Sequence, residues 1–189
     1  MQTFTLSKDI NSPEFTFPRL IGLTGPKGMG KTTFANRIGG QILSLSTPIK
    51  KMLEHIVPNL YIYEEKEKQI PGFPDGITAR VLMQRLGTEF GRECNPLIWV
   101  NHTKEKIKDY LAWADATDHY NFRVIVDDIR FANEALMITE LGGEIWKVAR
   151  NDYTPQQDSH SSEDGLPEEY IDKEIIVDDY KGATADTTA

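Results

Sequence analysis

A glycine-rich segment, Gly25 to Thr32, constrains the fold of this chain more than any other part of the sequence. It reads GPKGMGKT and fits the pattern G-x-x-x-x-G-K-S/T at every fixed position. An apolar run from Arg19 to Thr24 precedes it, and a stretch able to form a helix, Thr32 to Ile38, follows it. A strand, a tight loop and a helix in this order predict a phosphate-binding loop, because the glycines let backbone N–H groups converge on phosphate oxygens.

Two side chains of this loop suit a bound nucleotide. Lys31 supplies a positive charge, and Thr32 offers a hydroxyl group to Mg²⁺. The alternative is an ordinary glycine-rich turn. A chance match in a chain of this length is about a one-in-a-hundred event at the usual glycine frequency, so we favour the phosphate-binding loop.

Short apolar runs alternate with helical stretches along most of the chain. The expected strands are Arg19 to Thr24, Gln41 to Leu45, Phe122 to Val126, Glu144 to Ala149 and Glu174 to Val177. Five strands separated by helices predict an α/β fold, in which a doubly wound sheet of five parallel strands lies between two layers of helices. We interpret residues 1–18 as an N-terminal extension, residues 19–180 as one domain and residues 181–189 as a tail.

Helical patterns interrupt this alternation between about residues 48 and 117. The charged run from Glu64 to Lys68 is interpreted as a solvated face. A helix is expected from Ile77 to Phe90, and Asn95-Pro96 is expected to cap and begin the next one.

One face of the helix from Ile77 to Phe90 carries Arg80, Gln84, Gly87 and, just beyond it, Gly91. A helical glycine costs on the order of 1 kcal/mol relative to alanine, so Gly87 needs a reason. Close approach of a ligand and a crossing helix are both open. Trp99 could stack on a base or fill the core, and its periodicity favours the core.

The expected strand from Phe122 to Val126 ends in Asp127 and Asp128. The carboxyl ends of parallel strands form the edge where open α/β sheets bind ligands, and the phosphate-binding loop lies at the same edge. Both aspartates are therefore candidates for holding Mg²⁺ or orienting a substrate, the alternative being a cap on the next turn. Arg130 could bind a phosphate through its planar guanidinium or form a surface salt bridge.

Composition excludes several classes of protein. The chain has 189 residues, with 21 Lys and Arg against 29 Asp and Glu, and its net charge of −8 repels a nucleic acid backbone. Its one cysteine, Cys94, cannot form an internal disulfide, and its four histidines are too scattered for a structural zinc site. Long apolar runs and a leader-like start are absent, so we expect a soluble cytoplasmic protein without membrane partners.

Four segments of the sequence resemble the bacteriophage deoxynucleoside monophosphate kinases, a branch of the P-loop nucleotide kinases. They are Gly22 to Thr33, Leu82 to Thr88 with Trp99 beyond it, Asp128 to Glu134, and His160 to Pro167. The resemblance implies a three-layer P-loop kinase fold with a five-stranded parallel sheet. It also implies a helical monophosphate-binding region at about residues 52–117 and a lid near residues 150–170.

The resemblance implies roles for individual residues as well. On the donor side, ATP would be bound by Lys27, Gly28, Met29, Gly30, Lys31, Thr32, Thr33, Arg150 and Asp179. On the acceptor side, a deoxynucleotide would be bound by Lys50, Arg80, Gly87, Thr88, Trp99, Asp128, Arg130 and Glu134. The catalytic residues would be Lys31, Arg80, Asp128 and Arg130, with Thr32 and Asp127 as the candidate magnesium ligands.

The expected function is transfer of the γ-phosphoryl group of ATP, with Mg²⁺, to a deoxynucleoside monophosphate, which supports DNA precursor synthesis. A different small-molecule P-loop kinase, such as a dephospho-coenzyme A kinase, is an open alternative, as is a nucleotide-binding ATPase or switch. The switch is disfavoured because the sequence has no N-K-x-D base-reading motif. A homodimer is left open.

Overall fold

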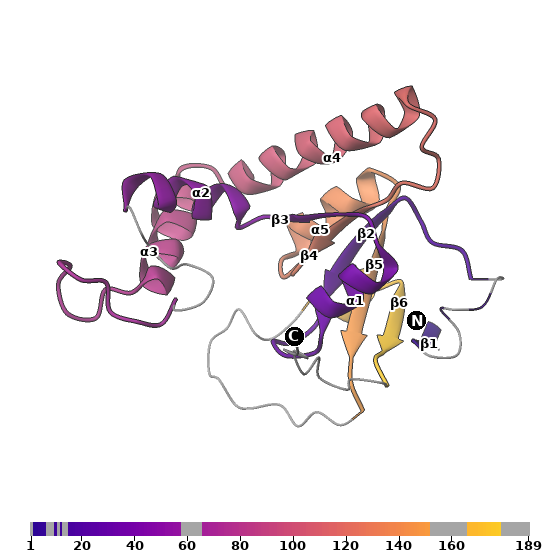
Figure 1. Cartoon of the computed structure of the whole chain (residues 1–189), viewed down its shortest axis with the longest axis horizontal. Coiled ribbons are helices and arrows are strands. Elements are labelled where there is room, and N and C mark those ends of the chain that lie inside the picture. Colours follow the sequence, from indigo (N-terminus) through magenta and orange to yellow (C-terminus); the bar gives the residue numbers. More distant parts are fainter. Residues whose placement is uncertain are drawn as a thin grey trace, which may run out of the picture. The chain divides into compact units, whose positions relative to one another are not determined.

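The computed structural model describes residues 2–6, 10, 12, 15–57, 66–151 and 166–178 (Figure 1). The chain divides into two compact units. The sheet unit comprises Met1–Ile42 and Asn121–Ala189, and the helical unit comprises Leu43–Tyr120. Each unit is described by itself below.

In the described part of the chain, the central sheet has six strands in the order β1-β6-β5-β2-β4-β3. They are β1 (Gln2–Thr5), β2 (Leu20–Thr24), β3 (Gln41–Ser44), β4 (Val124–Asp127), β5 (Glu144–Ala149) and β6 (Lys173–Ile176). The neighbours β1 and β6, β6 and β5, β5 and β2, and β2 and β4 pair in parallel. The predicted α/β fold with a parallel sheet is confirmed, and all five expected strands are present.

The prediction of five strands was wrong, because residues 2–5 of the expected N-terminal extension form a sixth. β1 lies at the edge of the sheet, where Phe4 pairs with Ile175 of β6. Pro13 and Pro18, which disfavour regular structure around them, both come after the strand in the sequence. A strand of four residues, QTFT, is too short for its periodicity to identify it.

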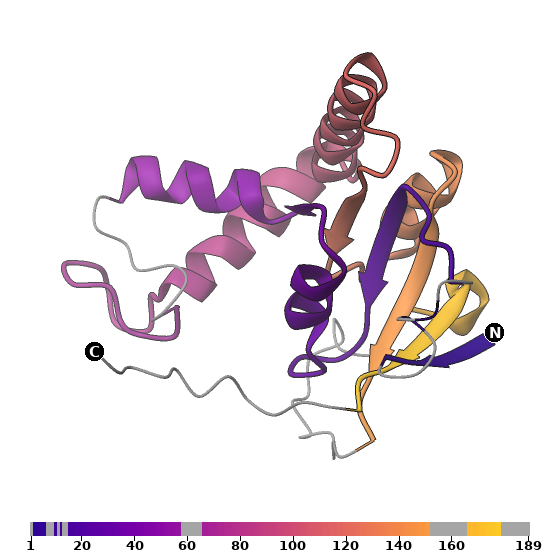
Figure 2. The ribbon, with the colours of Figure 1, turned by 45° about the vertical axis from the view of Figure 1, so that its right-hand side comes forward.

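Helices cover both faces of the sheet, as Figure 2 shows for α1 (Lys31–Ile38) and α5 (Ala132–Glu140). Alternation along β2 explains this arrangement, because successive side chains point to opposite faces. Ile21 and Leu23 join the core that contains Phe34 of α1. A Cβ atom on Gly22 would instead lie 3.2 Å from Ile138 of α5.

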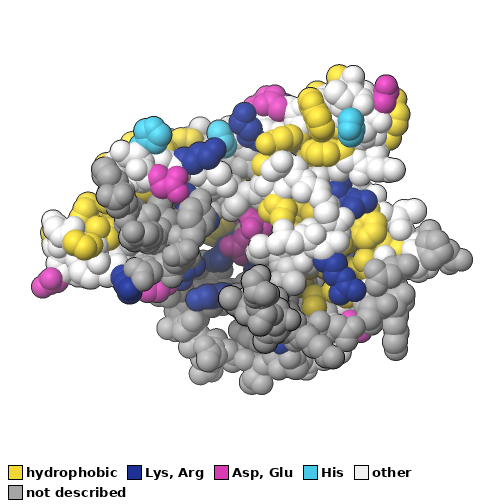
Figure 3. Space-filling model, in the orientation of Figure 1, with side chains coloured by type: hydrophobic (Ala, Val, Ile, Leu, Met, Phe, Trp, Pro, Cys, Tyr) yellow, Lys and Arg dark blue, Asp and Glu magenta, His cyan; other side chains and the backbone are white. Residues whose placement is uncertain are grey.

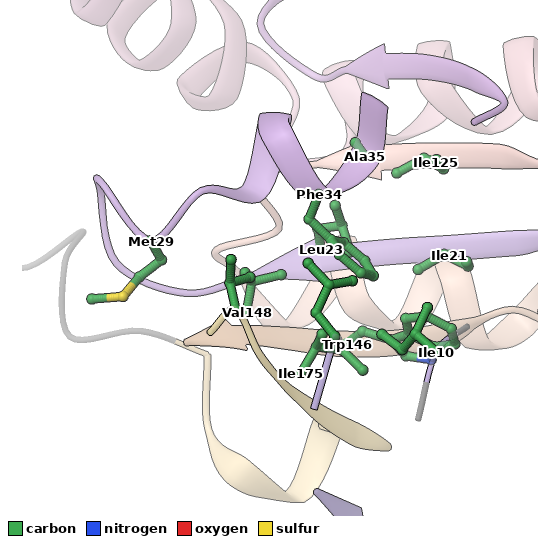
Figure 4. Close-up of a cluster of buried hydrophobic side chains, with 12 residues drawn as sticks. Ile10, Ile21, Leu23, Met29, Phe34, Ala35, Ile125, Trp146, Val148 and Ile175 are labelled. Carbon is green, nitrogen blue, oxygen red and sulfur yellow. The ribbon is translucent and has the colours of Figure 1, made fainter. Parts of the chain in front are cut away.

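The core between α1 and the sheet is centred on Trp146 of β5 (Figure 4). Phe34 contacts this indole at 6.2 Å between ring centroids, and Phe15 and Phe17 contact it at 5.7 and 5.8 Å. The N-terminal segment therefore contributes to the core as well as to the sheet.

The helical unit contains α2 (Thr47–Ile56), α3 (Ala79–Arg85), a π-helix η1 (Leu86–Arg92) and α4 (Ile98–Ala116). The helix expected from Ile77 to Phe90 is thus divided into α3 and η1. Thr78 caps α3, since its Oγ1 accepts a hydrogen bond from the backbone N–H of Val81 at 3.3 Å. α4 begins at Ile98, later than the expected Asn95-Pro96 start. Asn95 and Pro96 form a turn before it, in which the N–H of Ile98 donates to the carbonyl oxygen of Asn95 at 3.0 Å and the N–H of Leu97 donates to its Oδ1 at 2.9 Å.

None of the helices in the described part of the chain combines the length and apolarity that a membrane-spanning helix needs. On the face shown in Figure 3, the described basic and acidic side chains are interspersed with hydrophobic ones.

Candidate active site

The loop between β2 and α1 has the backbone geometry expected of a phosphate-binding loop. Gly25 has a φ of +130°, and a Cβ atom there would lie 2.5 Å from the carbonyl oxygen of Val148, so only glycine fits. Gly30 precedes α1 with a φ of +86°, and a Cβ atom on it would meet nothing within 4 Å. The open space beside Gly30 adjoins the helix N-terminus, whose backbone N–H groups and dipole favour an anion.

Lys31, the first residue of α1, is folded back onto the loop. Its Nζ donates hydrogen bonds to the carbonyl oxygens of Gly25 at 2.6 Å and Pro26 at 3.1 Å. It also lies 3.3 Å from Oδ1 of Asp128. An ammonium group has three N–H donors, so these contacts occupy all of them.

Asp128 bridges two cations. Besides the contact with Lys31, its Oδ2 accepts from Nε of Arg130 at 2.9 Å and lies 2.6 Å from the Nη2 atom. Burial acts to raise the pKa of Asp128, but the hydrogen bond and charge of Arg130, followed by those of Lys31, outweigh it and hold the pKa below its usual value of 3.8. The carboxylate thus lies between two cations, as a phosphate oxygen would.

Asp128 and Arg130 lie in the connection between β4 and α5. Asp128 has a φ of +62°, a left-handed conformation that few residues other than glycine, asparagine and aspartate adopt readily. Glu134, which is only 3% exposed, accepts hydrogen bonds from the backbone N–H groups of Arg130 at 2.9 Å and Phe131 at 3.2 Å. It therefore fixes the backbone that carries Arg130.

This role of Glu134 was missed in the sequence, where Glu134 was expected to bind the acceptor. A signal was present, because glutamate three residues into a helix is typical of a capping box. Contact between Glu134 and a ligand stays a prediction.

The candidate magnesium ligands fit the chemistry of that ion. Thr32 is exposed in the first turn of α1, and Asp127 is the half-buried last residue of β4. Hydroxyl and carboxylate oxygens suit Mg²⁺, which usually takes one or two protein ligands together with phosphate oxygens and water. No group of three or more metal-ligating side chains occurs in the described ranges, so substrate oxygens would have to complete the coordination.

The other donor-side candidates differ in how much of the side chain is accessible. Lys27, Gly28 and Thr33 are exposed, and Arg150 directly follows β5 and is half-buried. Met29 is 6% exposed and belongs to the sheet core, so it could offer a ligand little besides its backbone. Asp179 lies outside the described residues, as does most of the expected lid and of the segment from His160 to Pro167.

In the helical unit, Arg80 lies in the first turn of α3. Its Nε donates to Oε1 of Glu67, with which it forms an ion pair. Thr88 is exposed on η1, and Lys50 is half-buried on α2.

Packing within the helical unit explains its two unusual glycines. Trp99 is 6% exposed, and its Nε1 donates to the carbonyl oxygen of Gly87 at 2.8 Å. A Cβ atom on Gly91 would lie 2.5 Å from the indole of Trp99, and one on Gly87 would lie 3.1 Å from Ile49 of α2. These contacts agree with the crossing-helix explanation for Gly87, and the core position of Trp99 is confirmed. Binding of the acceptor by Gly87 and Trp99 stays a prediction.

The structure thus gathers the acceptor and catalytic candidates into two groups. In the sheet unit, Lys31, Asp128, Arg130 and Glu134 form one connected cluster at the phosphate-binding loop. In the helical unit, Gly87 and Trp99 are in direct contact, whereas Arg80 forms its ion pair with Glu67.

Comparison with known proteins identifies the family. The sequence matches the deoxynucleotide monophosphate kinase family over residues 59–182. A protein of Acanthamoeba polyphaga mimivirus, which carries the provisional name of deoxynucleotide monophosphate kinase, is 32% identical in an alignment 162 residues long. The match covers 76% of this chain and 80% of the viral protein. The chain belongs to the deoxynucleotide monophosphate kinase family. It is therefore a phosphotransferase of the nucleotide monophosphate kinase type.

The family match confirms the resemblance found in the sequence at the level of the family. The matched range contains Arg80, Trp99 and the connection that carries Asp128 and Arg130. The phosphate-binding loop lies before it, so the assignment of that loop depends on its sequence pattern and geometry.

Two solved structures are distantly similar to this family member. Protein TT1252 from Thermus thermophilus is 17% identical with a TM-score of 0.43, over 89% of this chain and 91% of its own. Dephospho-CoA kinase from Campylobacter jejuni is 18% identical with a TM-score of 0.38, over 87% and 90%. Similarity this distant adds nothing to the assignment, which depends on the family match.

Proposed function

We propose that this kinase transfers the γ-phosphoryl group of ATP to the 5′-phosphate of a deoxynucleoside monophosphate, giving ADP and a deoxynucleoside diphosphate for DNA synthesis. The observation that carries the proposal is the cluster of Lys31, Asp128 and Arg130 at a glycine-rich helix N-terminus, in a chain of this family. Residues 19–180 would act as one kinase domain, with residues 52–117 binding the acceptor and residues 150–170 acting as a lid.

The chemistry demands little acid or base catalysis from the protein. An oxygen of the acceptor monophosphate, already anionic near neutral pH, forms the new bond to the γ-phosphorus atom, and the bond from that atom to the bridging β,γ oxygen breaks. The bridging oxygen stays on ADP, so no proton needs to be transferred. The protein has to align two polyanions and neutralise the charge on the transferring group.

The residues of the sheet unit suit these tasks. The loop N–H groups and Lys31 would hold the donor phosphates, and Arg130 would bind oxygens of the transferring or the acceptor phosphate. Thr32 and Asp127 would hold Mg²⁺, which when bound neutralises charge on the donor oxygens. Arg80, Lys50 and Thr88 would bind the acceptor.

A coupled ADP-release assay tests the proposal. It compares the four deoxynucleoside monophosphates with their ribonucleotide counterparts and with dephospho-coenzyme A, at saturating ATP and Mg²⁺. Turnover with a deoxynucleotide is expected, and turnover with dephospho-coenzyme A alone would overturn the proposed acceptor. ADP release that ignores every acceptor would indicate an ATPase instead.

Replacing Lys31 with alanine tests the donor site separately. We expect kcat to fall roughly a hundredfold or more, because the transition state loses a preorganised charge. Lys106→Ala is the matched control, since Lys106 forms an exposed ion pair with Asp109 on α4. Near-normal turnover of Lys31→Ala would contradict the assignment of the loop.

A further inference from the structure

The guanidinium group of Arg80 is held at one edge only. Its Nε donates to Oε1 of Glu67. Among the residues that the structure describes, the side chain of Arg80 has no other hydrogen bond or ion pair. The two terminal nitrogens, Nη1 and Nη2, therefore remain available on a side chain that is 38% exposed.

Glu67 is fixed beside Arg80 by backbone contacts. The N–H of Arg80 donates to the carbonyl oxygen of Lys66 at 2.9 Å, and Gln69 forms a β-bridge with Thr78, which caps α3. In the described part of the charged run, Glu67 and Lys68 are exposed, as the sequence suggested. The segment that carries Glu67 is also attached to the start of α3.

The side chain of Gln69 strengthens this attachment. Its Oε1 accepts from the N–H of Gly76 at 2.8 Å, and its Nε2 donates to the carbonyl oxygens of Phe73 at 3.2 Å and Pro74 at 2.9 Å. The amide thus closes the loop that returns the chain from Glu67 to α3.

We propose that Glu67 is a positioning residue, which holds Arg80 by Nε and so presents Nη1 and Nη2 to the 5′-phosphate of the acceptor. The planar guanidinium can donate from both terminal nitrogens to two phosphate oxygens. Holding Nε in advance removes part of the rotamer entropy that Arg80 would otherwise lose on binding. The inference rests on the proposed function, because it takes Arg80 as an acceptor-binding residue.

The negative charge of Glu67 does not cancel this gain. Its side chain is 61% exposed, so water and dissolved ions screen its repulsion of a phosphate. It also accepts from Nε rather than from the two nitrogens that the phosphate needs. Glu67 therefore orients Arg80 without competing for the same donors.

The test compares Glu67→Ala, Glu67→Gln and wild type, with the acceptor that the wild-type enzyme uses. Glu67→Ala should raise KM for the acceptor, and its Kd in calorimetry, by about two- to fivefold, as expected for one partly exposed pair. kcat and KM for ATP should stay unchanged. Glu67→Gln should lie between wild type and Glu67→Ala, because the amide oxygen still accepts from Nε but no longer carries the charge.

Two further variants separate positioning from a general effect. In an Arg80→Ala background, Glu67→Ala should have no additional effect on the acceptor. Glu105→Ala is the control, because it removes the carboxylate of an exposed pair with Lys108 on α4, 2.8 Å apart, and it should leave KM unchanged.

Three results would overturn the role of Glu67. They are an unchanged KM in Glu67→Ala, a lowered KM, which would mean competition with phosphate, and an effect that persists without Arg80. Failure of the proposed function is a separate result, because wild type would then turn over none of the deoxynucleotides. That outcome would overturn the role of Glu67 as well.

Discussion

Replacing Asp128 with asparagine removes the charge that holds Lys31 and Arg130, so we expect the variant to bind ATP more tightly. Lys31 must leave Asp128 before its Nζ can reach a phosphate, because its three N–H donors are occupied by Gly25, Pro26 and Asp128. Asparagine keeps the size of the side chain and tolerates the left-handed backbone at this position.

The geometry gives the size of the effect. Two unit charges 3.3 Å apart would attract by about 5 kcal/mol at an effective dielectric constant of about 20. The side chain of Asp128 is 37% exposed, so screening reduces this towards the 0.2–1 kcal/mol that is typical of exposed pairs. Lys31 is only 12% exposed, which favours the upper end. A contribution of about 1 kcal/mol corresponds to a roughly fivefold lower Kd.

Calorimetric titration with a non-hydrolysable ATP analogue measures this change. Each variant is titrated with Mg²⁺ and again with EDTA, which separates the effect on Lys31 from any effect on the metal. The gain in affinity should shrink as salt is added, because the interaction is electrostatic. Asp109→Asn, which removes the charge of the exposed pair with Lys106, 3.4 Å apart, is the control. An equal or higher Kd for Asp128→Asn in EDTA would refute the reasoning.

Three further predictions concern stability. Glu134→Ala should lower the free energy of unfolding by about 2 kcal/mol or more, because two backbone N–H groups lose their acceptor. Glu134→Gln should lower it less, and urea unfolding measures both variants. Gly91→Ala should lower the free energy of unfolding by about 1–3 kcal/mol, which is more than Gly87→Ala should. The new Cβ atom at position 91 would meet the buried indole of Trp99, whereas the one at position 87 would meet the flexible end of an isoleucine. Thermal unfolding compares the two variants. The pKa of Asp128 in the folded protein lies below 3.8, so the stability that its charge contributes is complete above that pH and is lost as the pH falls through the folded value. Asp128→Asn should therefore make the free energy of unfolding less dependent on pH in acid. Curves of this free energy against pH that run parallel for the variant and wild type below about pH 4 would contradict this.

The sequence predicted what depends on local pattern. The loop from Gly25 to Thr32 fits a sequence pattern that seldom occurs by chance. Buried parallel strands such as β4 form nearly continuous apolar runs. The loop and the five expected strands were therefore found close to their observed positions.

What the sequence missed depends on partners far along the chain. The strand β1 exists because β6, about 170 residues later, offers it an open edge. Gly91 of η1 leaves room for the indole of Trp99, whose Nε1 also donates to the carbonyl oxygen of Gly87, 12 residues earlier. The sequence also missed the division of one expected helix into α3 and η1. A π-helical segment of seven residues is too short to show a periodicity of its own.

The candidate residues of the two units share one feature, the pairing of their cations with carboxylates. Arg80 in the helical unit, and Lys31 and Arg130 in the sheet unit, are each held by a carboxylate. The chain has more acidic than basic side chains, with a net charge of −8, so carboxylates are available for such pairs. Pairing keeps each cation in one orientation before a phosphate binds.

The effect of each carboxylate on binding depends on which donors it occupies. Asp128 occupies the last free N–H of Lys31, so a phosphate must displace it, and removing its charge should strengthen donor binding. Glu67 occupies only Nε of Arg80 and leaves the terminal nitrogens available, so removing it should weaken acceptor binding. Two ion pairs of the same chemical type therefore predict mutational effects of opposite sign, and measuring both would separate carboxylates that compete with phosphate from those that position its ligands.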